Sequence, residues 1–225
     1  MKNDLEIRLT EDGSHTLYDK KLSEPYHSLN GAVNESLHVF IRAGFHFIAE
    51  GTDVVKILEV GLGTGLNVLL TFAEAVSDKK RVEYTALEPY PPGEDILKHL
   101  NYSKILSNDA LKDVFSRIHG SGWDERTALE ESFYLTKLKT KLQDFQCPPS
   151  SFDLVYFDAF SPDVQPELWE LDVFRQLADL TRPGGVLATY SAKGQVRRNM
   201  QMAGYEVERL PGPKGKREML RAVRL

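Results

Sequence analysis

Cysteine is almost absent from this chain of 225 residues, which contains only Cys147. A single cysteine can form no intramolecular disulfide, and it makes a cysteine-based zinc site untenable. We therefore expect Cys147 to be a small, partly buried side chain. Such sparing use of cysteine is consistent with a reducing cytosol.

Long uninterrupted apolar runs are also lacking. The longest candidate, KILEVGLGTGLNVLLTFAEAV, is interrupted by glycines and by Glu59 and Asn67. A membrane-spanning helix needs about 18 or more consecutive apolar residues, so none is predicted. The first residues, MKNDLEIRL, lack the apolar core of a signal peptide. We expect a cytoplasmic protein.

Histidine clusters with metal-binding spacing are missing too. The six histidines are scattered and show no H-x₃-H pair; they are His15, His27, His38, His46, His99 and His119. Without paired histidines or cysteines, the sequence predicts no metal centre.

The net charge of −5 argues against a nucleic-acid partner, but the charge is unevenly distributed. Residues 193–225 carry +6 and the preceding residues carry −11. The nine basic residues of this end are Lys193, Arg197, Arg198, Arg209, Lys214, Lys216, Arg217, Arg221 and Arg224. This end is either a phosphate-binding face or an ordinary solvated surface, and charge alone leaves both readings open.

The N-terminal segment predicts a β-hairpin followed by a helix. Alternating residues flank Asp12-Gly13, a dipeptide typical of hairpin turns, and residues 28–51 have apolar side chains at helical spacing. We expect residues 1–50 to form an extension packed on a main domain of residues 51–225.

Strands and helices alternate through the main domain. Segments with strand character are 54–63, 81–90, 131–142, 151–160 and 185–192; helical ones are 65–78, 94–106, 109–119, 167–185 and 194–204. Two further strands, 205–212 and 218–225, are joined directly. This order predicts an α/β, Rossmann-like, doubly wound and mostly parallel sheet with a C-terminal antiparallel edge hairpin.

A glycine-rich turn follows the first strand of the main domain. Gly61, Gly63 and Gly65 are spaced G-x-G-x-G, whereas the dinucleotide fingerprint requires glycine at position 66, which is Leu66. This mismatch disfavours an NAD-binding oxidoreductase. Glu59, two residues before the turn, suits a ligand that carries an ammonium group. The alternative is a tight turn with no ligand.

Two acidic residues end strands that we expect to lie beside this turn. Glu88 follows the second strand, at the position where an acid accepts hydrogen bonds from ribose hydroxyls in doubly wound folds. Asp158 follows the fourth strand, in VYFDAFSPDVQPELW. Ligands bind at the carboxyl ends of such strands, so these carboxylates should converge on one crevice. An isolated Asp at this position could also serve only as a turn cap.

Together these motifs resemble class I S-adenosylmethionine-dependent methyltransferases. FDAFSPDVQPELW, LTRPGGVLATYSAKGQVRRNMQMAGYEVERLPGPKGKREML and DGSHTLYD…EPYHSLNGAVNES resemble more narrowly the tRNA methyltransferase family that converts wobble 5-aminomethyl-(2-thio)uridine to its methylaminomethyl form. In bifunctional members this domain is fused to a flavin-dependent oxidase. Because no oxidase sequence follows Leu225, we expect the stand-alone form.

The resemblance implies roles for individual residues. Asp158 and Phe160 would lie at the methyl-transfer centre, with Asp158 also near the cofactor and Pro162 shaping the loop. The cofactor, S-adenosylmethionine, would be bound by Glu59, Gly61, Gly63, Gly65, Asn67 and Glu88. The N-terminal Tyr26, His27 and Ser28 would close over the pocket, where Tyr26 and His27 would meet the substrate. Apart from the resemblance, the basic end suggests contacts with phosphates of the tRNA anticodon stem-loop by Lys193, Arg197, Arg198, Lys214, Lys216 and Arg217. The rings of Phe160 or Tyr190 could stack on the uracil, or could simply pack in the core.

One position departs from the common methyltransferase pattern. Lys141 stands where an acid often approaches the adenine amino group, and Asp144 follows three residues later. Other functions on this fold remain open: a small-molecule amine methyltransferase, an aminopropyltransferase, or a non-catalytic RNA-binding protein.

Overall fold

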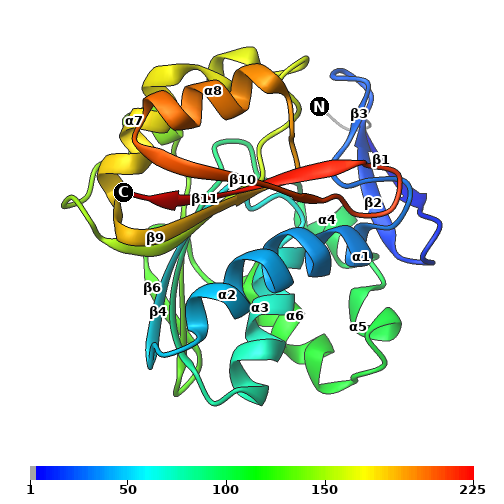
Figure 1. Ribbon diagram of the computed structural model, residues 1–225. Helices are drawn as coiled ribbons and strands as arrows, with labels where there is room; N and C mark the ends of the chain where they lie inside the picture. The colour runs from blue at the N-terminus through cyan, green and yellow to red at the C-terminus, as the bar shows by residue number, and fades with distance from the viewer. Residues whose placement is uncertain (1–3) are drawn as a thin grey trace.

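An eight-stranded sheet forms the centre of the computed structural model, which describes residues 4–225 (Figure 1). The strand order is β10-β11-β9-β8-β4-β5-β7-β6. The five parallel strands are β4 (Val54–Val60), β5 (Arg81–Leu87), β7 (Phe133–Leu138), β8 (Phe152–Phe157) and β9 (Thr181–Thr189). The predicted doubly wound sheet is confirmed, and strands β4 and β8 lie next to each other at its switch point.

Both edges of the sheet are antiparallel. The hairpin of β10 (Tyr205–Pro211) and β11 (Glu218–Arg224) forms one edge, as predicted. At the other edge β6 (Arg126–Glu130) pairs with β7, and this strand was not predicted. Its sequence gives a weak signal because Leu129 is its only fully buried residue.

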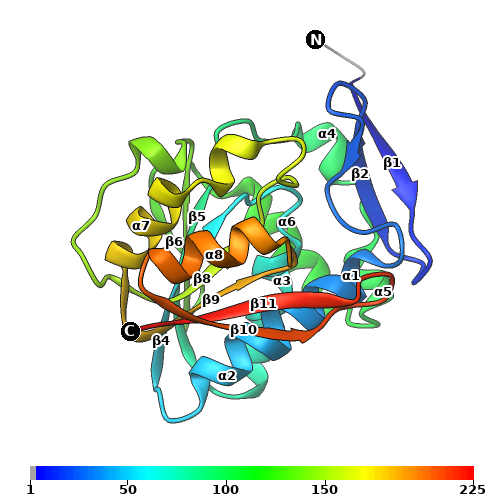
Figure 2. The ribbon, with the colours of Figure 1, turned by 45° about the horizontal axis from the view of Figure 1, so that its top comes forward.

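Helices cover both faces of the sheet (Figures 1 and 2). One face carries η3 (Pro166–Trp169), α7 (Leu171–Leu180) and α8 (Gly194–Met202); the other carries η1 (Leu37–Phe45), α2 (His46–Ala49), α3 (Leu66–Ser77) and α6 (Ala110–Gly120). Strand β8 shows the alternation that serves both layers: Leu154 and Tyr156 join one hydrophobic cluster, while Val155 and Phe157 join the other. Shorter turns of helix are α4 (Glu94–Leu97), α5 (Tyr102–Ile105) and η2 (Leu142–Asp144).

The prediction of one long helix over residues 167–185 is wrong in its extent. Residues Pro166–Trp169 form a short 3₁₀ turn, α7 ends at Leu180, and Thr181–Gly185 already belong to β9. The Thr181 hydroxyl donates to the Leu177 carbonyl at 2.7 Å and closes the helix before Pro183. Residues 94–106 likewise form two short helices instead of one.

The N-terminal segment forms a separate three-stranded sheet, followed by α1 (Ala32–Ser36) and the π-helical η1. The strands are β1 (Leu5–Leu9), β2 (His15–Asp19) and β3 (Glu24–Pro25). The hairpin and helix were predicted; the π-helical geometry was not. Leu17, Val33 and Phe40 pack in the same hydrophobic cluster as Val55 of the main sheet. The boundary near residue 50 stays a prediction, and the core is continuous across it.

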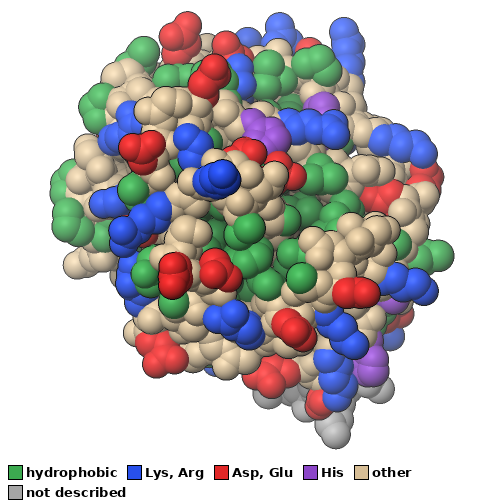
Figure 3. All heavy atoms as spheres, turned by 90° about the horizontal axis from the view of Figure 1, so that it is seen from below, with side chains coloured by type: hydrophobic (Ala, Val, Ile, Leu, Met, Phe, Trp, Pro, Cys, Tyr) green, Lys and Arg blue, Asp and Glu red, His purple; other side chains and the backbone are tan. Residues whose placement is uncertain are grey.

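The face seen in Figure 3 carries Lys, Arg, Asp and Glu side chains intermingled, with hydrophobic side chains gathered near its middle. No patch of a single charge sign dominates the visible part of this face. Among the described helices, none is both long and apolar enough to cross a membrane.

Candidate active site

A large cavity opens at the carboxyl ends of β4, β5 and β8. Its volume is about 1570 Å³, and it is lined by the turns after these strands, by residues 24–29 of the N-terminal segment, and by Glu35 and Lys216. The cavity therefore lies where the parallel sheet reverses its strand order, as predicted from Gly61, Glu88 and Asp158.

The glycine turn brings two strands together behind this cavity. Gly61 has a φ of 94°, and a Cβ at this position would lie 2.6 Å from the Asp158 carbonyl oxygen. The Asp158 amide donates to the Val60 carbonyl at 3.0 Å. Glycine is thus required where the turn after β4 meets the turn after β8. Gly61 and Gly63 line the cavity, while Gly65 lies at the start of α3 behind it.

Glu88 reaches the cavity from the end of β5 and fixes the glycine turn. Its carboxylate accepts hydrogen bonds from the amides of Gly63, at 3.0 Å, and Tyr90, at 2.9 Å. Burial raises the pKa of Glu88, and these two bonds oppose that rise. Each Glu88 oxygen keeps further acceptor capacity, which fits the predicted contact with ribose hydroxyls.

Asp158 is held by a buried amide behind the cavity wall. Asn67 donates from its Nδ2 to Asp158 Oδ2 and to Glu59 Oε1, each at 2.9 Å. Glu59 and Asn67 are buried, at 1 % and 2 % exposure, and do not line the cavity as Asp158 does. Their predicted contact with the cofactor stays a prediction. What the structure brings together is a Glu59–Asn67–Asp158 chain of hydrogen bonds.

The environment of Asp158 shifts its protonation toward neutral pH. Burial raises its pKa to about 7, and the negative charge of Glu35 adds to this rise; the Asn67 hydrogen bond and Lys216 oppose it. A carboxyl group with a pKa near 7 can accept a proton at physiological pH. Glu59 has a pKa raised well above its usual value, chiefly by burial.

Two aromatic rings form the wall in front of the glycine turn. Tyr26 and Phe160 pack edge to face with their centroids 5.0 Å apart. A Cβ on Gly63 would come 3.1 Å from the Tyr26 ring, so Tyr26 lies directly over the turn. Tyr26 therefore lies against the glycine turn, and closure of the N-terminal segment over a bound ligand stays a prediction.

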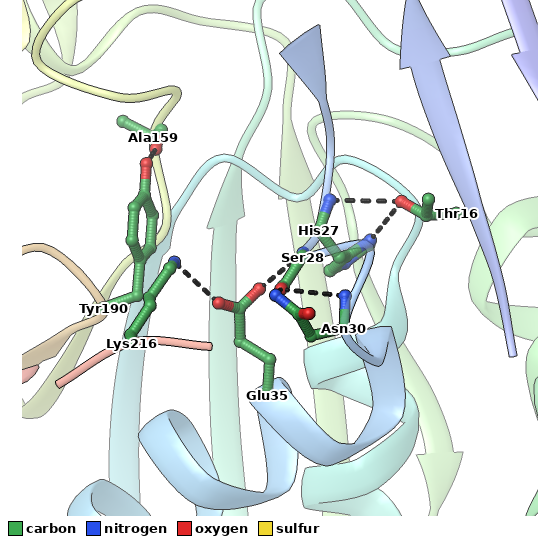
Figure 4. Close-up of polar contacts among 8 residues, drawn as sticks. All are labelled: Thr16, His27, Ser28, Asn30, Glu35, Ala159, Tyr190 and Lys216. Atoms are coloured by element: carbon green, nitrogen blue, oxygen red, sulfur yellow. Dashed lines mark hydrogen bonds and ion pairs between the residues drawn. The ribbon is translucent and has the colours of Figure 1, made fainter. Parts of the chain in front are cut away.

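His27, in contrast, is an internal support. Its Nδ1 lies 3.1 Å from the Thr16 hydroxyl, and burial lowers its pKa to about 4, so the ring is neutral at physiological pH (Figure 4). His27 is only 9 % exposed. It supports the N-terminal sheet and also lines the cavity together with the rest of residues 24–29, so its contact with substrate stays a prediction.

Tyr190 forms part of the cavity wall on the side of the C-terminal hairpin. Its hydroxyl donates to the Ala159 carbonyl at 2.8 Å, which braces the loop between Asp158 and Phe160 (Figure 4). The Lys216 ammonium lies 3.8 Å from the centre of the Tyr190 ring.

Several of the predicted phosphate-binding residues already have anionic partners. Lys193 pairs with Asp163, Lys214 with Glu11 and Lys216 with Glu35. Of the other predicted tRNA contacts, Arg197, Arg198 and Arg217 make no ion pair among residues 4–225. The basic end is therefore more neutralised than its sequence suggests.

The cavity wall also holds three residues outside the predicted cofactor and tRNA contacts. Lys141 and Asp144 both line the cavity, so the position that lacks the usual acid is still part of the site. Glu35 lines it as well, although an acidic residue in the first turn of a helix normally signals only a favourable helix dipole. No pattern in the sequence points to Glu35.

Fold and site together define a class I methyltransferase: a parallel sheet with an antiparallel edge hairpin, a glycine turn after its first strand and a carboxylate after the second. A family model described as "S-adenosyl-L-methionine-dependent methyltransferase" matches residues 106–225. The chain belongs to this family, whose cofactor is S-adenosylmethionine.

Individual relatives carry more specific names. The chain is 33 % identical over 94 % of its length to the "tRNA 5-methylaminomethyl-2-thiouridine biosynthesis bifunctional protein MnmC" of Ralstonia nicotianae, and equally identical over 94 % to that of Cupriavidus metallidurans. It spans about one third of these proteins, 33 % and 32 % respectively.

Solved structures of other proteins share this fold. The crystal structure of MNMC2 from Aquifex aeolicus is 29 % identical with a TM-score of 0.77, covering 97 % of this chain and 70 % of that one. Spermidine synthase from Thermotoga maritima, at 10 % identity and a TM-score of 0.57, covers 97 % of this chain and 67 % of the other. This second likeness reflects the fold alone.

Proposed function

We propose that this protein transfers a methyl group from S-adenosylmethionine to the aminomethyl nitrogen of wobble 5-aminomethyl-(2-thio)uridine in tRNA. The observation that carries the proposal is the position of Asp158. Its carboxyl group lies on the wall of the cavity at the switch point and has a pKa near 7. The names of the MnmC relatives and of MNMC2 support the choice of substrate.

The residues present fit the cofactor. The glycine turn presents the backbone of Gly61 and Gly63 to the cavity, Glu88 offers acceptors for hydroxyl groups, and the buried Asn67 Oδ1 has no hydrogen-bond partner among residues 4–225. When bound, the cofactor supplies an electrophilic methyl group on a sulfonium. Gly61, Gly63 and Glu88 would hold it, with Lys141 and Asp144 bordering the same cavity.

The chain must supply an unprotonated amine in the right orientation. A primary alkylammonium has a pKa of about 10.4, so it is mostly protonated at neutral pH. Asp158 would accept the proton and orient the nitrogen lone pair. The N–C bond then forms as the C–S bond breaks, and the electron pair of that bond remains on sulfur. With a pKa near 7, Asp158 lies roughly three pH units below the amine, far closer than an ordinary aspartate.

The aromatic and basic residues would position the nucleic acid. Phe160 and Tyr26 offer ring surfaces for a splayed uracil. The exposed Arg198 and Arg217 and the half-buried Arg197 offer cations for phosphates of the anticodon stem-loop.

The test is transfer of labelled methyl from S-adenosylmethionine to tRNA bearing 5-aminomethyluridine, with free polyamines assayed beside it. Label is expected in the wobble nucleoside, and Asp158→Ala should abolish it while leaving the fold intact. Label in the polyamines alone would instead assign a small-molecule amine transferase. Full activity of Asp158→Ala would refute the role given to that carboxylate.

A further inference from the structure

A partly buried ion pair on the cavity wall joins the N-terminal segment to the C-terminal hairpin. Glu35, on α1, accepts a 2.7 Å hydrogen bond from the Lys216 ammonium, which comes from the loop between β10 and β11 (Figure 4). The Glu35 side chain is 8 % exposed and the Lys216 side chain 32 %. Both residues line the same cavity as Asp158.

The Lys216 ammonium occupies a subsite with the features of an ammonium receptor. It has a carboxylate at 2.7 Å and the face of Tyr190 at 3.8 Å from the ring centre. A carboxylate together with an aromatic face is the combination that recognises cationic amines. Glu35 is fixed by a 2.7 Å hydrogen bond from the Ser28 amide, and Tyr190 by its bond to Ala159.

The proposed substrate carries the same functional group as lysine, a primary alkylammonium. We propose that the Glu35–Tyr190 subsite binds the substrate ammonium, and that Lys216 occupies it until the substrate displaces it. This inference rests on the proposed function and names the group that selects its substrate.

Lys216 is also placed between two hollows of the surface. Lys216 borders a shallow groove of about 340 Å³ next to the main cavity, which is lined as well by Lys193 and Arg217. A nucleic acid entering the cavity would bring phosphates to this basic groove. The displaced Lys216 ammonium would then pair with a phosphate instead of with Glu35. The substrate ammonium would pair with Glu35, so that each charged group keeps a partner of opposite charge.

Two carboxylates then have separate tasks. Glu35 recognises the protonated amine, and Asp158 accepts its proton before methyl transfer. Glu35 also contributes to the high pKa of Asp158. A neutral group such as a hydroxymethyl could not displace Lys216, because it would leave the buried Glu35 carboxylate without a cation.

The experiment measures binding of two nucleosides, 5-aminomethyluridine and the neutral 5-hydroxymethyluridine, by calorimetry in the presence of S-adenosylhomocysteine. Lys216→Met should increase the affinity for the aminomethyl nucleoside at least fivefold, because the competing ammonium is gone. Glu35→Gln should reduce it about tenfold and abolish the preference over the hydroxymethyl nucleoside. The glutamine oxygen can still accept the Ser28 amide, so the fold should be retained, as thermal unfolding and cofactor-product affinity would verify.

The chain offers a matched control pair. Lys214 and Glu11 also join this loop to the N-terminal segment, at 2.8 Å, but neither lines the cavity. Glu11→Gln should leave both nucleoside affinities within twofold.

The proposal is overturned if Lys216→Met weakens aminomethyluridine binding, or if Glu35→Gln keeps the preference for the amine. Failure of the proposed function would give a different pair of results. The preference for the aminomethyl nucleoside would still depend on Glu35, but the unaltered protein would transfer no methyl group to tRNA.

Discussion

Asn67 donates a 2.9 Å hydrogen bond to Asp158, although the two residues lie 91 positions apart in the chain. The bond crosses from the first turn of α3 to the turn after β8, the two sides of the switch point. The same amide nitrogen also donates to the buried Glu59. Asp158 is thus oriented from behind by a residue that itself lies outside the cavity.

Replacing Asn67 with Leu should therefore change catalysis through Asp158. The hydrogen bond lowers the pKa of Asp158, so its loss should move the lower midpoint of the pH–rate profile upward. Misorientation of the carboxylate should reduce the single-turnover rate by about 10- to 100-fold. The measurement is the rate of methyl transfer between pH 6 and 9.

Thr71→Val is the matched control, since Thr71 is buried one turn further along α3 and bonds Tyr156 at 3.2 Å. It should lower stability without moving the midpoint. An unchanged midpoint in Asn67→Leu would contradict the positioning role.

Asp158→Asn should stabilise the protein at alkaline pH. The pKa of Asp158 is raised from 3.8 to about 7, so the folded state holds its proton more tightly than the unfolded state does. The stability from this group is present below pH 3.8 and is lost as the pH rises through 7. Asparagine avoids that loss and can still accept the bond from Asn67.

The gain in unfolding free energy should therefore be larger at pH 8 than at pH 5, by on the order of 2 to 3 kcal/mol. Urea unfolding at both pH values measures it. An equal effect at pH 5 and pH 8 would show that Asp158 titrates normally.

Gly61→Ala should destabilise the fold and weaken cofactor binding together. The added Cβ would lie 2.6 Å from the Asp158 carbonyl oxygen at a backbone φ of 94°, so the turns after β4 and β8 must separate. The expected cost is about 2 kcal/mol or more, measured by urea unfolding, with a parallel loss of S-adenosylmethionine affinity in calorimetry. Gly120→Ala, where nothing lies within 4 Å, should be nearly neutral. Similar costs for the two variants would contradict the close approach at Gly61.

The sequence predicted those parts of the site that depend on the backbone path. Gly61, Glu88 and Asp158 each directly follow a buried strand, and parallel strands bring their carboxyl ends to one edge. Their convergence could therefore be inferred from strand order without any knowledge of side-chain contacts.

Glu35 and the neutralised cations could not be inferred in this way. The pairs Lys216–Glu35 and Lys214–Glu11 join residues some 180 to 200 positions apart, and only the packing of the terminal hairpin loop on the N-terminal segment creates them. Charge counts along the chain treat such cations as free. His27 shows the same limit, because its contact with Thr16 of β2 forms only when the N-terminal strands pair.

Arg217 should contribute more to tRNA binding than the other cations of its loop. Replacing Lys214, Lys216 and Arg217 together with Ala should weaken tRNA binding, but Lys214 must first leave Glu11, and Lys216 must leave Glu35. Arg217 is exposed, borders the shallow basic groove and has no ion-pair partner among the described residues. Each phosphate contact contributes to the salt dependence, so Arg217→Ala should reduce the slope of log affinity against log salt by about 1.

Filter binding of tRNA across a salt series measures this slope, with cofactor affinity as the test of an intact fold. Lys112→Ala serves as the control because Lys112 is also exposed but lies on α6, outside the residues that line the basic groove. It should leave the slope unchanged, and Lys214→Ala should have a smaller effect than Arg217→Ala. If Lys214→Ala lowers the slope as much as Arg217→Ala does, the Glu11 pair does not restrain Lys214, and the loop binds phosphate as an undifferentiated cluster of positive charge.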